Sequence, residues 1–193
     1  MLELILYSIL IVVILTPCGY FFSRKNTLTI TNLSNDLIYG IILISFISLV
    51  LNFFIPLNQL VNSIVLLLPL IILYKKKKHF FSKQFLYFLT FNSLIVFLLL
   101  AKSNVYRPDA MLYHLPYTGI LNNEKIIFGL TNLHFRFGHI SIIQYFSAFF
   151  NNILFESKGI VFSTAIIASA VIINFLSQTL IYIKKKIFNF HFF

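Results

Sequence analysis

Residues 4–22 read LILYSILIVVILTPCGYFF, a stretch of 19 residues without a charged side chain. A helix rises about 1.5 Å per residue, so about 20 apolar residues cross the hydrocarbon core of a bilayer. Glu3 precedes the stretch and the basic pair Arg24–Lys25 follows it, which is the reverse of the charge order in a cleaved export signal. The stretch therefore predicts a membrane-spanning helix that is retained in the protein.

The composition of the whole chain agrees with a lipid environment. Of its 193 residues, 59% are hydrophobic and 10% are charged, whereas soluble domains are about 45–50% apolar and about 25% charged. A chain with so few polar side chains cannot cover a globule of this size in water. The composition excludes a soluble enzyme, a disordered tail and a collagen-like chain, and it predicts an all-α integral membrane protein.

Four further apolar segments have the length of membrane-spanning helices. They are Leu37–Ile55, Leu60–Tyr74, Phe85–Ala101 and Ile160–Ile183. The sequence thus predicts about five spans in three parts. Residues 1–102 form a four-helix transmembrane region, residues 103–158 a large loop, and residues 159–193 the last span with a basic tail.

Three basic clusters predict the orientation of these spans. Arg24–Lys25, Lys75–Lys78 and Lys184–Lys186 each follow an apolar segment, and such clusters stay in the cytoplasm. All three fall inside if the N-terminus and the loop 103–158 are extracytoplasmic. The abundance of Ile, Lys, Asn and Phe is typical of AT-rich bacterial genes, so we expect a bacterial inner (plasma) membrane. The net charge of +10 is explained by topology and by contact with anionic lipid headgroups, so no nucleic-acid partner is expected.

The segment Ile140–Phe155 has a different pattern. Its polar side chains recur at steps of three and four residues, as an amphipathic helix requires. They are Ser141, Gln144, Ser147, Asn151 and Asn152, with Ile and aromatic side chains on the opposite face. A further span here would place Lys184–Lys186 outside, so we predict an interfacial helix that lies on the extracytoplasmic membrane surface.

The loop Ser103–Lys158 holds most of the side chains that can perform chemistry. The remainder of the chain has eleven Lys and Arg residues but only two acids, whereas the loop has four bases and three acids. Three of the five histidines also lie in the loop. We therefore expect any functional site in this segment.

The first cluster in the loop is the stretch Arg107–Pro116. Pro108 is favourable in the first turn of a helix, which places Asp109 near the helix N-terminus. An ionised Asp109 could accept a proton from a hydroxyl group or bind a cation. The alternative, which the local pattern favours, is that Asp109 only complements the helix dipole and pairs with Arg107.

The second cluster is the stretch Gly129–His139. Arg136 with His134 and His139 is a candidate phosphate or pyrophosphate site, and Gly138 would allow close approach of the backbone. The alternative is an aromatic-belt loop whose basic side chains reach lipid headgroups. A zinc site is not expected, because the two histidines are five residues apart and no cysteine or acid accompanies them.

The two clusters together resemble a known signature. The residues Asp109, Tyr113–Pro116, Gly129–Leu130, Asn132–His134, Arg136, Gly138 and Ser141 follow one another in the order of that signature. It is the large-loop signature of a group of bacterial polytopic membrane proteins similar to GT-C-type glycosyltransferases. The resemblance covers Asp109 to Ala148.

The resemblance implies an activity and roles for the residues. GT-C enzymes transfer a sugar from a polyprenyl phosphate or pyrophosphate outside the cytoplasm, so the implied partner is a lipid-linked sugar donor for cell-envelope glycans. Asp109 would be the catalytic base, or the acid that binds a divalent cation as cofactor. Arg136, with His134 or Arg107, would neutralise the donor phosphate. His114 and His139 complete the expected substrate-binding set.

The sequence departs from the GT-C pattern in two respects. Many of these enzymes have paired acids in the loop, whereas the next acid after Asp109 is Glu124, fifteen residues later. GT-C chains also have more spans, and the groove for the donor lipid needs them. We therefore expect an N-terminal portion of such an enzyme, completed by further helices or by a second polypeptide.

Two other functions stay open. One is a non-catalytic multi-pass membrane subunit whose external loop binds a partner or a lipid, and such a loop should tolerate Asn at position 109. The other is a small transporter, which is disfavoured because no acid or base lies centrally in a predicted span.

Overall fold

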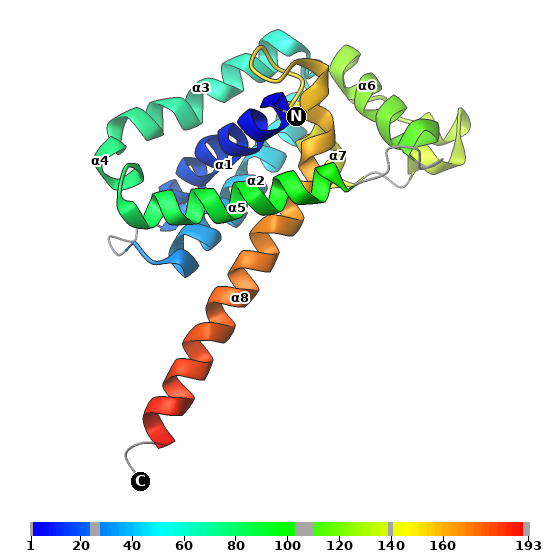
Figure 1. Ribbon diagram of the computed structural model, residues 1–193. Coiled ribbons are helices and arrows are strands. Elements are labelled where there is room, and N and C mark those ends of the chain that lie inside the picture. The colour runs from blue at the N-terminus through cyan, green and yellow to red at the C-terminus, as the bar shows by residue number, and fades with distance from the viewer. Residues whose placement is uncertain (1, 24–27, 103–109, 139–140, 191–193) are drawn as a thin grey trace.

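The computed structural model describes residues 2–23, 28–102, 110–138 and 141–190, and every regular element in these ranges is helical. The long helices are α1 (Leu2–Ser23), α2 (Ile30–Asn52), α3 (Gln59–Lys75), α5 (Lys83–Ala101) and α8 (Phe162–Phe190) (Figure 1). The predicted all-α class is therefore confirmed for the described residues.

Four helical stretches are long and apolar enough to cross a membrane. They are Leu2–Ser23, Ile30–Asn52, Lys83–Ala101 and Glu156–Lys184. The helix α3 has 17 residues and is about 26 Å long, slightly less than the thickness of a typical hydrocarbon core. The protein is thus a multi-pass membrane protein, with four of the five predicted spans present at full length.

The start of α2 differs from the prediction. The span was expected from Leu37, but the helix begins at Ile30, where the Thr29 side chain accepts a hydrogen bond from the Asn32 backbone N–H at 3.1 Å. The first two turns contain buried polar side chains, among them Ser34 and Asp36. Hydropathy excludes these residues from a span, but in the fold they pack against neighbouring helices.

The helix α1 lies at the centre of the bundle. Of the residues in an apolar 18-residue stretch of α1, 56% are buried, whereas in the corresponding stretch of α5 only 28% are buried. It packs against α2, α3 and α5. Gly19 of α1 and Gly40 of α2 let the two backbones touch, because a Cβ atom would lie 1.6 Å from the Asp36 carbonyl oxygen and 2.0 Å from the Leu15 carbonyl oxygen, respectively.

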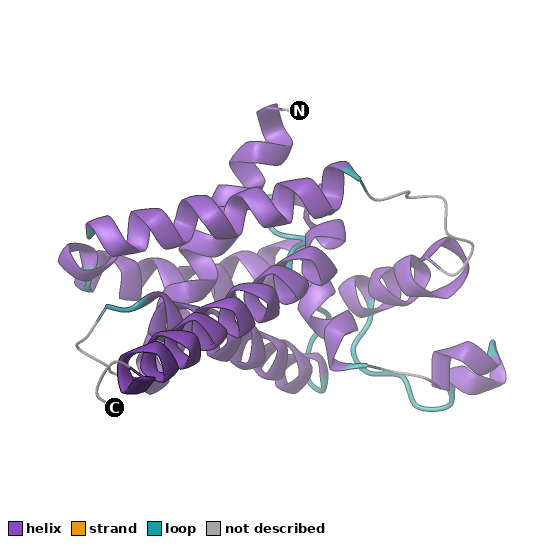
Figure 2. Ribbon diagram, turned by 60° about the horizontal axis from the view of Figure 1, so that its bottom comes forward, coloured by secondary structure: helices purple, strands orange, loops and turns teal. Residues whose placement is uncertain are grey.

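The loop after α5 folds into short helices at one end of the bundle. They are the π-helical turn η1 (Ala110–His114), the α-helices α6 (Leu115–Asn123) and α7 (Ile142–Phe149), and the 3-10 turns η2 (Leu130–Asn132), η3 (Phe135–Gly138) and η4 (Glu156–Val161). Figure 2 shows α6 and its neighbouring turns projecting beyond the long helices. These elements share a small apolar core with the turn between α2 and α3, which contributes Leu57. The other members of this core are Tyr117, Leu121, Leu130, Tyr145 and Ala148.

The structure corrects the expected surface of α7. The predicted interfacial helix was to expose its polar stripe, but Gln144 and Ser147 are buried. The Ser147 hydroxyl donates a hydrogen bond to the Ser163 hydroxyl oxygen of α8 at 2.6 Å. The exposed side chains are instead Ile142 and Ile143. The stripe is buried because its side chains find partners inside the fold: Ser147 bonds to α8, whereas the Gln144 side chain accepts a hydrogen bond from the Ser141 backbone N–H at 3.0 Å.

Candidate functional site

The structure describes half of the predicted site. His114, His134 and Arg136 lie in the described part of the chain, whereas Arg107, Asp109 and His139 lie outside it. The site can therefore be built from η1, which carries His114, from η3, which carries Arg136, and from the link between η2 and η3, which carries His134.

Arg136 joins the two predicted clusters. Its guanidinium carbon lies 5.1 Å from the centre of the Tyr113 ring in η1 and 5.6 Å from the centre of the Phe135 ring. Such cation–π contacts hold the guanidinium group beside both rings. A guanidinium group is also the side chain best suited to bind phosphate oxygens as a fork. The two clusters thus form one site.

His134 lies directly beside this arginine. Its Nδ1 accepts a hydrogen bond from the backbone N–H of Arg136 at 3.3 Å, and its ring stacks on Phe135 with 5.1 Å between the ring centres. When Nδ1 is an acceptor, the proton of the neutral ring is on Nε2. The histidine therefore offers an N–H donor on the side away from the backbone, which is the group that an anionic ligand needs.

His114 is placed by η1. Its side chain is exposed, and its ring lies 4.2 Å from that of Tyr113, measured between ring centres. Tyr113 therefore has the His114 ring beside it and the Arg136 guanidinium over its face. This places His114 at the edge of the same cluster.

Two glycines shape the turns that carry the site. Gly129 has φ 83°, a left-handed conformation in which a side chain is unfavourable. Gly138 was expected to allow a ligand to approach the backbone, but its open side faces Thr131, whose Cγ2 atom would lie 2.6 Å from an added Cβ. The missing side chain of Gly138 thus serves the packing of η3 on η2.

The cluster rests on a buried tyrosine pair. The Phe137 ring of η3 lies 5.8 Å from that of Tyr117, measured between ring centres, and Tyr117 is 1% exposed. Burial, together with a hydrogen bond to Tyr145, raises the pKa of Tyr117 above that of an ordinary tyrosine. Tyr117 therefore keeps its proton at neutral pH and supports the site rather than exchanging protons in it.

Sequence reasoning missed the residues that attach this loop to the bundle. The amide nitrogen of Asn62 in α3 lies 2.6 Å from the Leu57 carbonyl oxygen, 2.8 Å from that of Ala148 and 2.9 Å from that of Asn151. The amide of Asn122 in α6 donates to the same Leu57 oxygen at 2.6 Å. One buried side chain in each of these helices thus binds the backbone of the α2–α3 turn.

Asn52 at the end of α2 forms a second attachment. Its amide nitrogen lies 3.0 Å from the Glu124 carbonyl oxygen and 3.3 Å from that of Leu121, both at the end of α6. The only signal in the sequence was an asparagine on each side of a short turn between two apolar segments. That signal is also typical of ordinary helix caps, so it could not reveal the partners.

The surface around the site is unusually apolar for a loop. Phe128 is 86% exposed, Leu133 is 78% exposed and Phe135 is 68% exposed. Exposed aromatic and aliphatic side chains next to basic ones are typical of segments that lie in the lipid headgroup region. The site is therefore built from the side chains expected where protein, water and lipid meet.

The described residues do not assemble a metal centre. In the part of the chain that the structure describes, no group of three or more His, Cys, Asp or Glu side chains is arranged to hold an ion. Asp109, the acid to which the sequence analysis assigns a cation, lies outside that part. Arg136 and His134 offer N–H donors, which suit an anionic ligand rather than a cation.

Comparison with known proteins places the chain in a family. Residues 1–193 match the family described as "Domain of unknown function (DUF8201)", so the chain belongs to that family. No curated protein matches the chain. No solved structure matches it either.

Proposed function

We propose that this member of the DUF8201 family is the loop-bearing, N-terminal part of a membrane glycosyltransferase. It would transfer a sugar from a lipid-linked donor to an extracytoplasmic acceptor in cell-envelope glycan synthesis. The observation that carries the proposal is the contact of Arg136 with Tyr113, since it brings the two loop segments together, as a shared site for the donor phosphate would require. The resemblance of the loop to GT-C-like proteins supports the same reading.

In this proposal the chemistry is a displacement at the anomeric carbon of the donor sugar. Asp109 accepts the proton of the acceptor hydroxyl, whose oxygen then bonds to the anomeric carbon. The bond between that carbon and the donor phosphate oxygen breaks, and the electron pair leaves with the polyprenyl phosphate. Arg136 and the Nε2–H of His134 stabilise the charge that develops on this leaving group. In its alternative role Asp109 would bind a divalent cation instead of accepting this proton.

The surroundings of the site agree with a lipid-linked substrate. The phosphate of such a donor lies at the membrane surface, and exposed apolar residues such as Phe128 and Leu133 are expected to keep the loop there. The long isoprenoid chain needs a groove between membrane helices. Further helices, or a second polypeptide, would complete that groove in the proposed enzyme.

A binding experiment tests the anion site first. The purified protein should bind a polyprenyl phosphate in detergent or nanodiscs, and it should bind the corresponding uncharged polyprenol about 10- to 100-fold less tightly, since charge-assisted hydrogen bonds contribute roughly 1.5–3 kcal/mol. Arg136→Ala should remove this preference. Lys125→Ala is the matched control, because it deletes an exposed base from the same loop. Equal binding of phosphate and alcohol by the parent protein would contradict the proposal.

A turnover experiment tests catalysis separately. In the protein as its gene encodes it, Asp109→Asn should lower sugar transfer from a polyprenyl-phosphate sugar by about 100-fold or more, as expected for loss of a general base. The variant should still bind the donor. Normal turnover by the variant would exclude Asp109 as the base. Donor binding without any transfer by the parent protein would favour the non-catalytic subunit, whose external loop only binds a lipid or a partner.

A further inference from the structure

The C-terminal half of α8 leaves the helix bundle. Figure 1 shows this helix extending beyond the other long helices. Phe175 is 70% exposed and Tyr182 is 69% exposed, although Ile166 and Ala170, one or two turns earlier, are fully buried. This half of α8 therefore presents a long exposed face, and it belongs to the stretch Glu156–Lys184, which is long and apolar enough to cross a membrane.

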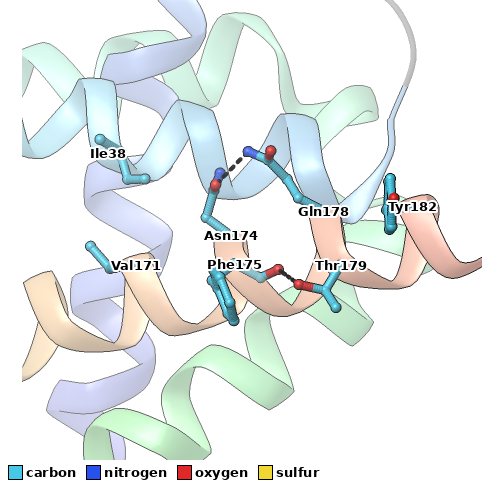
Figure 3. A pocket seen from close by; sticks show the side chains of 7 residues that line it. All are labelled: Ile38, Val171, Asn174, Phe175, Gln178, Thr179 and Tyr182. Carbon is cyan, nitrogen blue, oxygen red and sulfur yellow. Dashed lines mark hydrogen bonds between the residues drawn. The ribbon is translucent and has the colours of Figure 1, made fainter.

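An amide pair lies on this free part of the helix (Figure 3). The Gln178 Nε2 donates a hydrogen bond to the Asn174 Oδ1 at 2.7 Å, and the Asn174 Nδ2 donates to the Asn35 Oδ1 of α2 at 2.6 Å. Asn174 is thus tied to α2, whereas Gln178 is exposed. Within the described residues the Gln178 Oε1 accepts no hydrogen bond, and an unsatisfied amide oxygen is unfavourable in a bilayer.

The free face has the spacing of a helix-pairing surface. Val171, Phe175, Gln178 and Tyr182 follow one another at steps of four, three and four residues and line a groove of about 470 Å³ between α8 and Ile38 of α2. Steps of this kind align side chains along one stripe that a second helix can interlock with. One polar residue within such a stripe fixes the register and the number of helices that associate.

We propose that this stripe pairs with the same stripe of a second copy of the chain. All copies of a membrane protein have the same orientation in the bilayer, so two α8 helices that meet must run parallel. A two-fold axis along the membrane normal then places Gln178 opposite Gln178. Each of these amides has one N–H and one oxygen left, so the pair exchanges two hydrogen bonds.

The chemistry of the face supports a copy of the chain rather than a different protein. Residues 171–182 contain no charged side chain, so nothing on this face selects a charged partner. A glutamine is self-complementary, because it donates and accepts equally well. The inference does not depend on the proposed transferase activity.

Disulfide crosslinking in native membranes tests the geometry. The parent chain is a suitable background, since its single cysteine, Cys18, is fully buried. Phe175→Cys should form a dimer of twice the chain mass on mild oxidation. Leu180→Cys is the matched control, because Leu180 is 59% exposed on the opposite side of the helix and should form few dimers. Equal crosslinking at both positions, or no dimer at Phe175→Cys, would overturn the proposal.

A second measurement tests the amide pair itself. Energy transfer between donor- and acceptor-labelled copies in liposomes, followed as the lipid content rises, gives the association constant. Gln178→Leu should lower that constant roughly tenfold, in keeping with the loss of two interhelical hydrogen bonds in a membrane. Its thermal unfolding is measured in parallel to confirm that the variant folds. An unchanged constant in a folded variant, or a crosslinked product that contains another protein, would overturn self-pairing through Gln178.

Discussion

Asn62 shows how single polar residues stabilise this apolar protein. Its amide is completely buried, and its nitrogen faces three backbone carbonyl oxygens from two separate segments. A membrane-spanning chain has few such groups, so each one has a large share in determining which segments meet. The carbonyl partners come from residues close to Leu57 and Ala148, which no pattern in the sequence links. The position of Asn62 was therefore visible in the sequence, whereas its function was not.

We expect Asn62→Ala to destabilise the protein by about 1–3 kcal/mol, because it removes three buried hydrogen bonds and leaves the Asn151 carbonyl without its amide donor, whereas the Leu57 and Ala148 carbonyls keep the Asn122 amide. Asn123→Ala is the matched control, since Asn123 is exposed and bonds only within α6, to Gly119 at 2.8 Å. The stability of the two variants is measured by thermal unfolding in detergent, followed by size-exclusion chromatography. Equal stability of the two variants would show that the Asn62 amide does not hold the loop on the bundle.

His79, at the opposite end of the bundle, makes the stability of the protein depend on pH. It lies in the short helix α4 (Lys77–Phe80), with its ring 4.6 Å from that of Tyr20 between centres. Burial, and then the positive charge of Lys76, lower the pKa of His79 below its usual value. In the unfolded chain a histidine titrates near pH 6.5. The native state thus binds fewer protons than the unfolded chain. The contribution of the neutral His79 to stability is therefore fully present above about pH 6.5, and it is lost as the pH falls through the lowered pKa.

We therefore expect the melting temperature of the parent protein to fall between pH 7.5 and pH 5. His79→Gln should show a smaller fall over the same range, because glutamine does not titrate. Scanning calorimetry or light scattering at several pH values compares the two proteins. A variant that loses as much stability on acidification as the parent would assign the effect to another group.

At the scale of elements, the fold depends on how closely α1 and α2 approach. The hydropathy of the sequence predicts both helices but contains no information about the distance between them. That distance is set by Gly19 and Gly40, each facing a carbonyl oxygen of the other helix. The same limit explains the errors at α2 and α7. Hydropathy assumes that polar residues avoid a bundle, whereas Asp36 and Gln144 are buried between helices.

Gly40→Ala should destabilise the protein by at least about 3 kcal/mol, since the added Cβ would lie 2.0 Å from the Leu15 carbonyl oxygen and the helices must separate. Gly119→Ala in α6 is the control, because nothing lies within 4 Å of its added Cβ. That variant should be neutral or more stable by about 0.5–1 kcal/mol, through the better helix propensity of alanine. Similar losses in both variants would mean that close packing at Gly40 is not the cause.

At the scale of the whole molecule, the sequence selected the residues of the candidate site but not the contacts between them. Local composition pointed to Arg136 and His134, because three of the five acids and three of the five histidines of the chain lie in the loop. It could not show that Arg136 stacks on Tyr113, since that contact joins turns separated by the whole of α6. The support by Tyr117 and Tyr145 was hidden for the same reason. Contacts of long range depend on packing, which a pattern along the chain does not record.

The predicted orientation of the helices in the membrane is also a property of the whole molecule. An ion pair joins Lys158, at the end of the loop, to Glu3 at the start of α1, with 3.0 Å between Nζ and Oε1. This contact places Glu3 and Lys158 at the same end of the helix bundle, as the predicted orientation requires. Lys76 lies at the other end of α3, directly before α4. If α3 crosses the membrane despite its 17 residues, Lys76 and Lys125 are in different compartments.

Cysteine labelling of intact cells decides between the two arrangements. Both lysines are exposed, and the native Cys18 is buried, so single variants Lys125→Cys and Lys76→Cys can be made in the parent chain. We expect Lys125→Cys to react with a membrane-impermeant maleimide at once. Lys76→Cys should react only after the membrane is permeabilised, because the basic cluster around it stays in the cytoplasm. The reverse result would invert the topology and place the anion site on the cytoplasmic side, where an extracytoplasmic transfer is impossible. Labelling of both positions from outside would instead show that α3 does not cross the bilayer.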